Sequence, residues 1–103
     1  MPRKGGILYM RNYELLIVVQ PDLDETASAE IITKITGWVT EVGGVVVKTD
    51  DWGKRRMAYQ IRKQREGHYV LMQLTMEPAA TTELERNLRF LETVMRHMIT
   101  LAD

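Results

Sequence analysis

Apolar residues recur along this chain at two different spacings, and the change between them divides the chain into six segments. Alternation of apolar and polar positions is typical of a strand with one buried face, whereas recurrence at three and four residues is typical of an amphipathic helix. Alternation predicts strands over residues 11–19, 45–61, 68–76 and 93–101. Helical spacing predicts one helix that buries Ala27, Ile31, Ile35, Trp38, Val39 and Val42, and a shorter one that buries Ala80, Leu84, Leu88 and Leu91.

The first helix has recognisable end signals. Asp22 or Asp24 can cap its start, and Asp22 with Glu25 three residues later resembles a capping box. The pair Gly43 and Gly44 ends it, because glycine is common just past a helix C-terminus. We therefore expect one continuous helix between Asp24 and Gly43.

The middle of the chain predicts a bent hairpin. Gly53 lies inside the second strand and indicates a bulge or sharp bend there. Residues 63–67 are the expected hairpin turn, and Pro78 marks the exit from the third strand. Thr82 with Glu85 resembles a capping box for the second helix.

The order strand, helix, strand, strand, helix, strand (βαββαβ) predicts an α+β fold. Two right-handed split strand–helix–strand units give a ferredoxin-like sandwich, a four-stranded antiparallel sheet with two helices on one face. With 103 residues the chain is expected to form one domain over residues 10–103. Residues 1–9, which contain Pro2 and two adjacent glycines, are expected to be a flexible N-terminal extension.

The face of the sheet that the helices leave uncovered is expected to carry an apolar patch. The core positions of the central strands are Tyr13, Leu15, Ile17 and Val19 on the first and Val70, Met72, Leu74 and Met76 on the third. Leu16, Val18, Tyr69 and Leu71 alternate with them, so they should be exposed and adjacent. A contiguous apolar patch often marks a protein-partner site. Stacking of RNA bases on an open sheet needs two or three aromatic residues, and only Tyr69 is expected there. Tyr13 and Tyr59 fall on core positions and predict packing.

The charges are balanced overall but separated along the chain. There are 14 basic and 14 acidic residues, yet residues 53–65 contain six basic residues and no acid. Residues 20–41 contain five acids and a single base, Lys34. Lys54, Arg55 and Arg56 follow the bend at Gly53, and we call these three residues the basic bend. It predicts contact with a polyanion, with a solvated surface as the alternative.

Several classes of function have little support. Without cysteine, disulfides, thiolate zinc sites and cysteine nucleophiles are excluded. The longest apolar run, residues 15–19, is too short to cross a bilayer, and the protein is most simply intracellular. His68 and His97 lie in no metal-ligand or nucleophile motif, and Arg11 with Asn12 is the one weak pair for phosphate-ester hydrolysis. We expect no catalytic residue, cofactor, metal or small-molecule substrate.

Five ordered motifs give the chain a family resemblance. They are residues 10–14 (MRNYE), 51–55 (DWGKR), 57–61 (MAYQI), 67–72 (GHYVLM) and 88–98, which include Leu88-Arg89-Phe90 and Arg96-His97-Met98. Together they resemble the bacterial small-subunit (30S) ribosomal protein six family over residues 10–101. The departures are Gln60, where the family usually has proline, the absence of a charged C-terminal tail, and residues 1–9, which leave Met1 and Met10 as candidate initiators.

The resemblance implies a structural role in the small ribosomal subunit, in the cytoplasm. It implies binding to the central domain of small-subunit rRNA as a pair with small-subunit ribosomal protein eighteen. The positions it assigns to rRNA contact are Arg11, Lys54, Arg55, Arg56, Arg89, Arg96 and His97. Arg96 could equally pair with Glu14, and Arg89 could stabilise a helix dipole. A free-standing small enzyme or ligand-binding module of the same fold remains the alternative.

Overall fold

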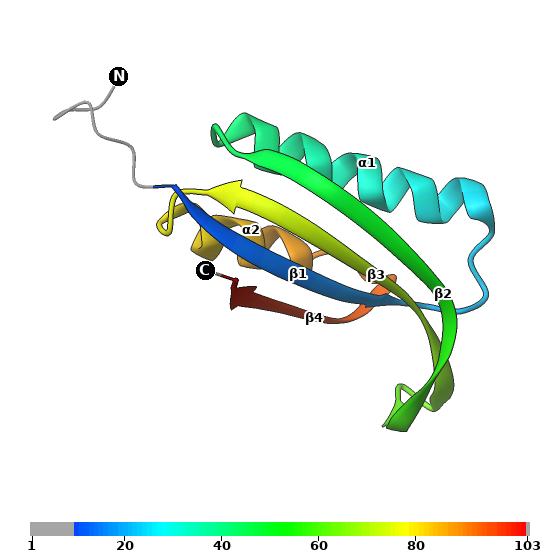
Figure 1. Ribbon diagram of the computed structural model, residues 1–103. Coiled ribbons are helices and arrows are strands. Elements are labelled where there is room, and N and C mark those ends of the chain that lie inside the picture. Colours follow the sequence, from blue (N-terminus) through cyan, green and yellow to red (C-terminus); the bar gives the residue numbers. More distant parts are fainter. Residues whose placement is uncertain (1–9, 103) are drawn as a thin grey trace, which may run out of the picture.

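The computed structural model describes residues 10–102, so the expected N-terminal extension, residues 1–9, lies outside the described part. The elements are β1 (Arg11–Val19), α1 (Glu25–Glu41), β2 (Val45–Ile61), β3 (Gln64–Met76), α2 (Ala80–Arg89) and β4 (Val94–Leu101). The four strands form one antiparallel sheet in the order β2-β3-β1-β4, and both helices cover the same face (Figure 1). The predicted α+β ferredoxin-like fold is confirmed.

A single main core lies between this sheet and the helices. The predicted inward faces of β1 and β3 are buried, and Leu15, Ile17, Met72 and Leu74 have almost no exposed surface. Ile35 and Val39 of α1 and Leu84 and Leu88 of α2 pack onto them. The periodicity of the sequence therefore identified most of the main core, including Tyr13, whereas Ala27 and Val42 of the predicted helix stripe are only partly buried and lie outside it.

Helix α1 is capped at its start by Asp24, and the predicted glycine pair follows its end. The Oδ1 atom of Asp24 accepts a hydrogen bond from the Ala27 backbone N–H at 2.8 Å, so the expected capping box starting at Asp22 is wrong. At the other end Gly43 has φ +84°, a left-handed conformation that glycine adopts without strain. The Gly44 N–H then donates to the Val39 carbonyl at 2.8 Å, which closes the last turn.

Helix α2 begins earlier than expected, and without the predicted capping box. Its first residue is Ala80, and its N-cap Ala79 makes no side-chain hydrogen bond. The Pro78 carbonyl accepts hydrogen bonds from the backbone N–H and the Oγ1 atom of Thr81. The turn at Pro78 thus places the start of the helix at Ala80, and Thr82 lies inside the helix and not at its cap.

The β2–β3 hairpin is longer and tighter than the sequence suggested. Its turn is the two-residue connection Arg62–Lys63, with φ +52° and +66°, so the expected turn at residues 63–67 is wrong. Positive φ at both positions matches the twist of the flanking strands, as in the favoured two-residue hairpin turns. Gly53 has φ +75° at a shift of register between Asp51 and Gly53, which confirms the predicted bend.

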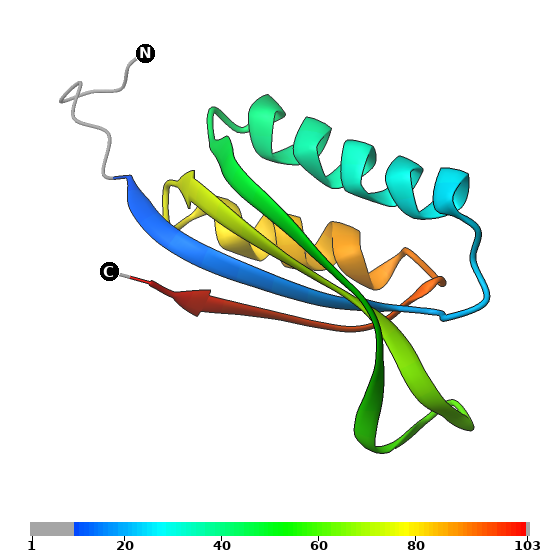
Figure 2. The ribbon, with the colours of Figure 1, turned by 45° about the vertical axis from the view of Figure 1, so that its right-hand side comes forward.

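Beyond Gly53 the hairpin curls toward the side of the sheet opposite the helices (Figure 2). Near its tip four residues of β2, 57–60, lie opposite one residue of β3, so the alternation of faces is interrupted. The curl forms a second, smaller core of Val18, Met57 and Met95. Val18 is only 3% exposed, so its predicted place on an exposed patch is wrong. The hairpin covers it.

Candidate functional site: the open face and the basic bend

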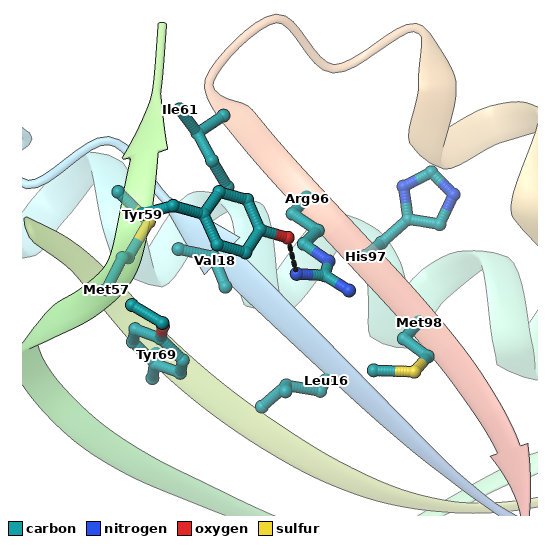
Figure 3. A pocket seen from close by; sticks show the side chains of 10 residues that line it. Leu16, Val18, Met57, Tyr59, Ile61, Tyr69, Arg96, His97 and Met98 are labelled. Carbon is teal, nitrogen blue, oxygen red and sulfur yellow. Dashed lines mark hydrogen bonds between the residues drawn. The ribbon is translucent and has the colours of Figure 1, made fainter. Parts of the chain in front are cut away.

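The face of the sheet without helices, which we call the open face, contains a hollow of about 190 Å³ beside the curled hairpin (Figure 3). Its floor comes from three strands and is apolar. It consists of Leu16 and Val18 of β1, Tyr69 of β3 and Met98 of β4. Met57 and Tyr59 of the hairpin form a wall, and Arg96 lies on the side of β4.

The expected apolar patch is present in part. The register pairs Leu16 with Leu71 and Val18 with Tyr69, so the four residues are neighbours as predicted. Leu16, Tyr69 and Leu71 are half-buried, whereas Val18 is covered. On its other side Leu16 is paired with Met98, which is 42% exposed and which the sequence analysis missed. Met98 lies two residues after Arg96 in β4, so alternation places both residues on the same face. This spacing was the signal in the sequence.

The open face carries more aromatic surface than expected. Trp52 lies against Tyr69 with the ring planes at 10° and their centroids 6.4 Å apart, a stacked pair. The guanidinium of Arg55 lies 6.0 Å from the centroid of the Trp52 ring, and its Nε atom donates to the Trp52 carbonyl. The expectation of a single aromatic residue on this face is therefore wrong, because the bend at Gly53 brings Trp52 over Tyr69.

Tyr59 is the third aromatic residue, and it is not in the core. Its side chain is 59% exposed, and its hydroxyl oxygen accepts a hydrogen bond from Nη1 of Arg96 at 2.6 Å (Figure 3). The predicted core packing of Tyr59 is wrong because residues 57–60 bulge out of the regular ladder.

The alternative pairing of Arg96 with Glu14 is also wrong. Arg96 lies opposite Val18, while Glu14 lies opposite Thr100, four residues further along β4.

The three residues of the basic bend are exposed but do not point the same way. Residues paired across two strands project from the same face. Arg55 is paired with Gly67 and lies on the side of Tyr69, whereas Lys54 is paired with His68 and Arg56 with Glu66. Lys54 and Arg56 therefore project from the opposite face of the hairpin. On that face Nε2 of His68 lies 2.6 Å from Oδ1 of Asp51. His68 therefore has a structural contact between β3 and β2.

The other predicted RNA contacts are spread over the molecule. Arg11 is exposed at the start of β1 and is paired with Met76, at the end of β3 far from the hairpin turn. Arg89 is the last residue of α2, and its Nη2 atom lies 3.8 Å from Oε1 of Glu85. At this position its charge stabilises the helix dipole, and the side chain is also accessible to a ligand. His97 is half-buried, and its imidazole points away from the hydrogen bond between Tyr59 and Arg96 (Figure 3). Only Arg96 adjoins the hollow with its charged group.

A further basic residue ties the hairpin to the rest of the fold. Nη1 of Arg62, in the hairpin turn, donates to the Glu92 carbonyl at 2.5 Å. This contact spans the tip of the hairpin and the connection between α2 and β4. Together with the Tyr59–Arg96 hydrogen bond it holds the hairpin against β4, so the wall of the hollow is attached at two points.

The described residues lack other types of site. Within residues 10–102 there is no group of three His, Asp or Glu side chains that could hold a metal ion. No helix in that part of the chain is long and apolar enough to span a membrane. The open face and the cations around it are therefore the candidate functional surface.

Comparisons with known proteins agree with this architecture. The family model described as Ribosomal protein S6 matches residues 12–100. Small ribosomal subunit protein bS6 of Moorella thermoacetica is 47% identical over 91 residues, which are 88% of this chain and 93% of that protein. The bS6 protein of Exiguobacterium sp. is 48% identical over 91 residues, which are 88% of this chain and 96% of that protein. A crystal structure of 30S ribosomal protein S6 from Thermotoga maritima shares the fold, with a TM-score of 0.85, 23% identity and coverage of 91% of this chain and 89% of that one.

Proposed function

Because this chain belongs to the ribosomal protein S6 family, with a structural and not an enzymatic role in the small ribosomal subunit, we propose that it binds the central domain of small-subunit rRNA together with small-subunit ribosomal protein eighteen. The protein partner occupies the open face, and the rRNA contacts the basic residues. Family membership removes the alternative of a free-standing enzyme.

The observation that carries the partner site is the row of apolar residues across three strands. Leu71, Leu16 and Met98 lie side by side on β3, β1 and β4, and the row continues into the hollow. Antiparallel sheets usually present polar residues on an uncovered face, so a continuous apolar row there favours burial against another molecule. Removal of apolar area from water contributes about 25 cal/mol per Å² to such docking.

The rRNA contacts are supported by exposed cations on the hairpin. Lys54, Arg55 and Arg56 are exposed, and within residues 10–102 no ion pair joins any of them to an acid. Arginine can fork onto a phosphate, whereas lysine acts as a point charge. Because these cations project from both faces of the hairpin, they suit contact with a backbone that passes around it. Arg11 and Arg89 would extend the contact to other parts of the surface.

Charge on the apolar row tests the partner site. Leu71→Glu should abolish capture of purified ribosomal protein eighteen, because a carboxylate would be buried without a partner. Thr33→Glu, which adds the same charge to the exposed surface of α1, is the control and should leave capture unchanged. Circular dichroism should show both variants folded. Normal capture by folded Leu71→Glu protein would refute this site.

The salt dependence of RNA binding tests the basic bend. Replacement of Lys54, Arg55 and Arg56 by alanine should lower the slope of log K against log salt by roughly 0.7–0.9 for each phosphate that is no longer neutralised. Lys34→Ala, an exposed cation on α1, should not change the slope. The measurement is filter binding to a central-domain rRNA fragment with the partner protein present. An unchanged slope in the triple variant would remove the basic bend from the rRNA interface.

A further inference from the structure

Arg96 is a cation beside an apolar hollow, and no acid among residues 10–102 forms an ion pair with it. Its guanidinium has five N–H donors, and the hydrogen bond it makes is to the neutral hydroxyl of Tyr59. Figure 3 shows the guanidinium on the same side of β4 as the hollow, next to Leu16 and Met98. A charged donor group is thus held at the rim of an apolar surface.

We propose that the hollow takes one apolar side chain from an extended segment of the protein partner, and that Arg96 pairs with a carboxylate of that same segment. This inference rests on the proposed function, because it assumes a protein on the open face. It goes further by assigning a chemistry to the bound segment. It also moves Arg96 from the rRNA contacts to the protein interface.

The lining of the hollow favours a protein side chain over an unpaired nucleotide. In the floor Leu16, Val18 and Met98 offer no side-chain hydrogen-bonding group, and Tyr69 offers only its hydroxyl. A nucleobase, by contrast, has several polar edge atoms that must be paired when buried. About 190 Å³ is also below the roughly 300–1,000 Å³ of typical small-molecule pockets, so the space suits a single side chain. The guanidinium of Arg96 is exposed in the free chain, and a partner that covers it would stabilise the complex by placing a carboxylate one or two residues from that side chain.

Tyr59 is a positioning residue in this arrangement. Its hydroxyl holds Nη1 of Arg96 at 2.6 Å, and the hairpin that carries it is tied down by Arg62 and by the burial of Met57. A guanidinium that is already oriented loses less side-chain entropy when it pairs. Tyr59→Phe should therefore weaken partner binding by a smaller factor than loss of Arg96, while keeping the wall of the hollow.

The test measures partner affinity and RNA binding separately. The full chain is titrated with purified ribosomal protein eighteen by calorimetry without RNA. Arg96→Gln should raise Kd by about 30-fold or more, as for truncation of one partner of a buried charge pair, and Arg96→Lys should recover part of the loss. With saturating partner, the salt slope of rRNA binding should be the same for Arg96→Gln and wild type. Lys54→Gln is the matched control, with normal Kd and a lower slope.

A double-mutant cycle locates the carboxylate. Each Asp and Glu of the partner is changed to Asn or Gln, and one of these changes should remove the effect of Arg96→Gln, because both substitutions break the same ion pair. If Arg96→Gln leaves Kd within threefold of wild type, or if no partner acid is coupled to it, the inference is overturned. A lowered salt slope would then assign Arg96 to a phosphate. Should Arg96→Gln fail to fold, the same cycle is run with Tyr59→Phe, and absence of any effect overturns the inference.

Failure of the proposed function would look different. In that case the wild-type chain itself would show no binding to ribosomal protein eighteen, and both proposals would fall together. Binding by the wild type that does not depend on Arg96 would refute only the inference about the hollow.

Discussion

Replacing Gly67 with alanine tests how closely the curled hairpin lies on the sheet. A Cβ atom added at Gly67 would lie 2.3 Å from Cγ1 of Val18 and 3.3 Å from Cε of Met95. Val18, Met95 and Met57 form the second core, where each is 9% exposed or less, so the valine has little room to move away. The backbone of Gly67 does not have a positive φ, and the effect is therefore one of space and not of backbone conformation.

Overpacking of this kind typically lowers the free energy of unfolding by about 1–3 kcal/mol. In a domain of about 100 residues each kcal/mol corresponds to a fall in Tm of about 4–8 °C. Gly37→Ala is the matched control, because Gly37 is exposed within α1 and nothing lies within 4 Å of its added Cβ. That substitution should stabilise the protein by up to about 1 kcal/mol through helix propensity. The two Gly→Ala changes are thus expected to have opposite signs.

A double substitution identifies the cause. Val18→Ala removes both methyl groups of the valine, including the one that the new Cβ would strike. Alone it should lower the free energy of unfolding by about 1.6 kcal/mol, at about 0.8 kcal/mol for each buried group. Combined with Gly67→Ala it should be less destabilising than the sum of the two single changes by about 0.5 kcal/mol or more. Urea unfolding followed by circular dichroism measures all four proteins. Stability of Gly67→Ala within about 0.5 kcal/mol of wild type, or simple additivity with Val18→Ala, would refute close packing of the hairpin on Val18.

Two further predictions concern α1. Ser28 is 7% exposed, and its Oγ atom has no hydrogen-bond partner among residues 10–102. Ser28→Ala should therefore raise the free energy of unfolding by about 1 kcal/mol, since it removes an unsatisfied hydroxyl and improves helix propensity. A loss of stability in urea would show that the hydroxyl is paired. Asp24→Ala removes the acceptor for the Ala27 N–H and should lower stability by about 1 kcal/mol, whereas Asp22→Ala should change it by less than about 0.5 kcal/mol. Equal effects at Asp22 and Asp24 would contradict the assignment of the cap.

The sequence by itself determined the element order, the ferredoxin-like fold and the main core. These depend on local periodicity, which is visible in any window of about ten residues. Leu15, Ile17, Met72 and Leu74 were identified as core residues because regular alternation continues unbroken through β1 and the second half of β3. The neighbouring positions Leu16 and Leu71 followed from the same alternation and from the strand order.

Only the tertiary structure decided which residues of the open face are exposed. The curl of the hairpin buries Val18, brings Trp52 onto Tyr69, and joins Tyr59 to Arg96 across 37 positions of sequence. The Trp52–Tyr69 contact depends on the bend at Gly53, and the contacts of the hairpin tip depend on a two-residue turn with positive φ and on four residues of β2 opposite one of β3. An irregularity of that kind reverses the faces of all residues beyond it, and its position is fixed by packing between distant strands. The period-two pattern of residues 57–61 could not predict it, because that pattern assumes a regular ladder.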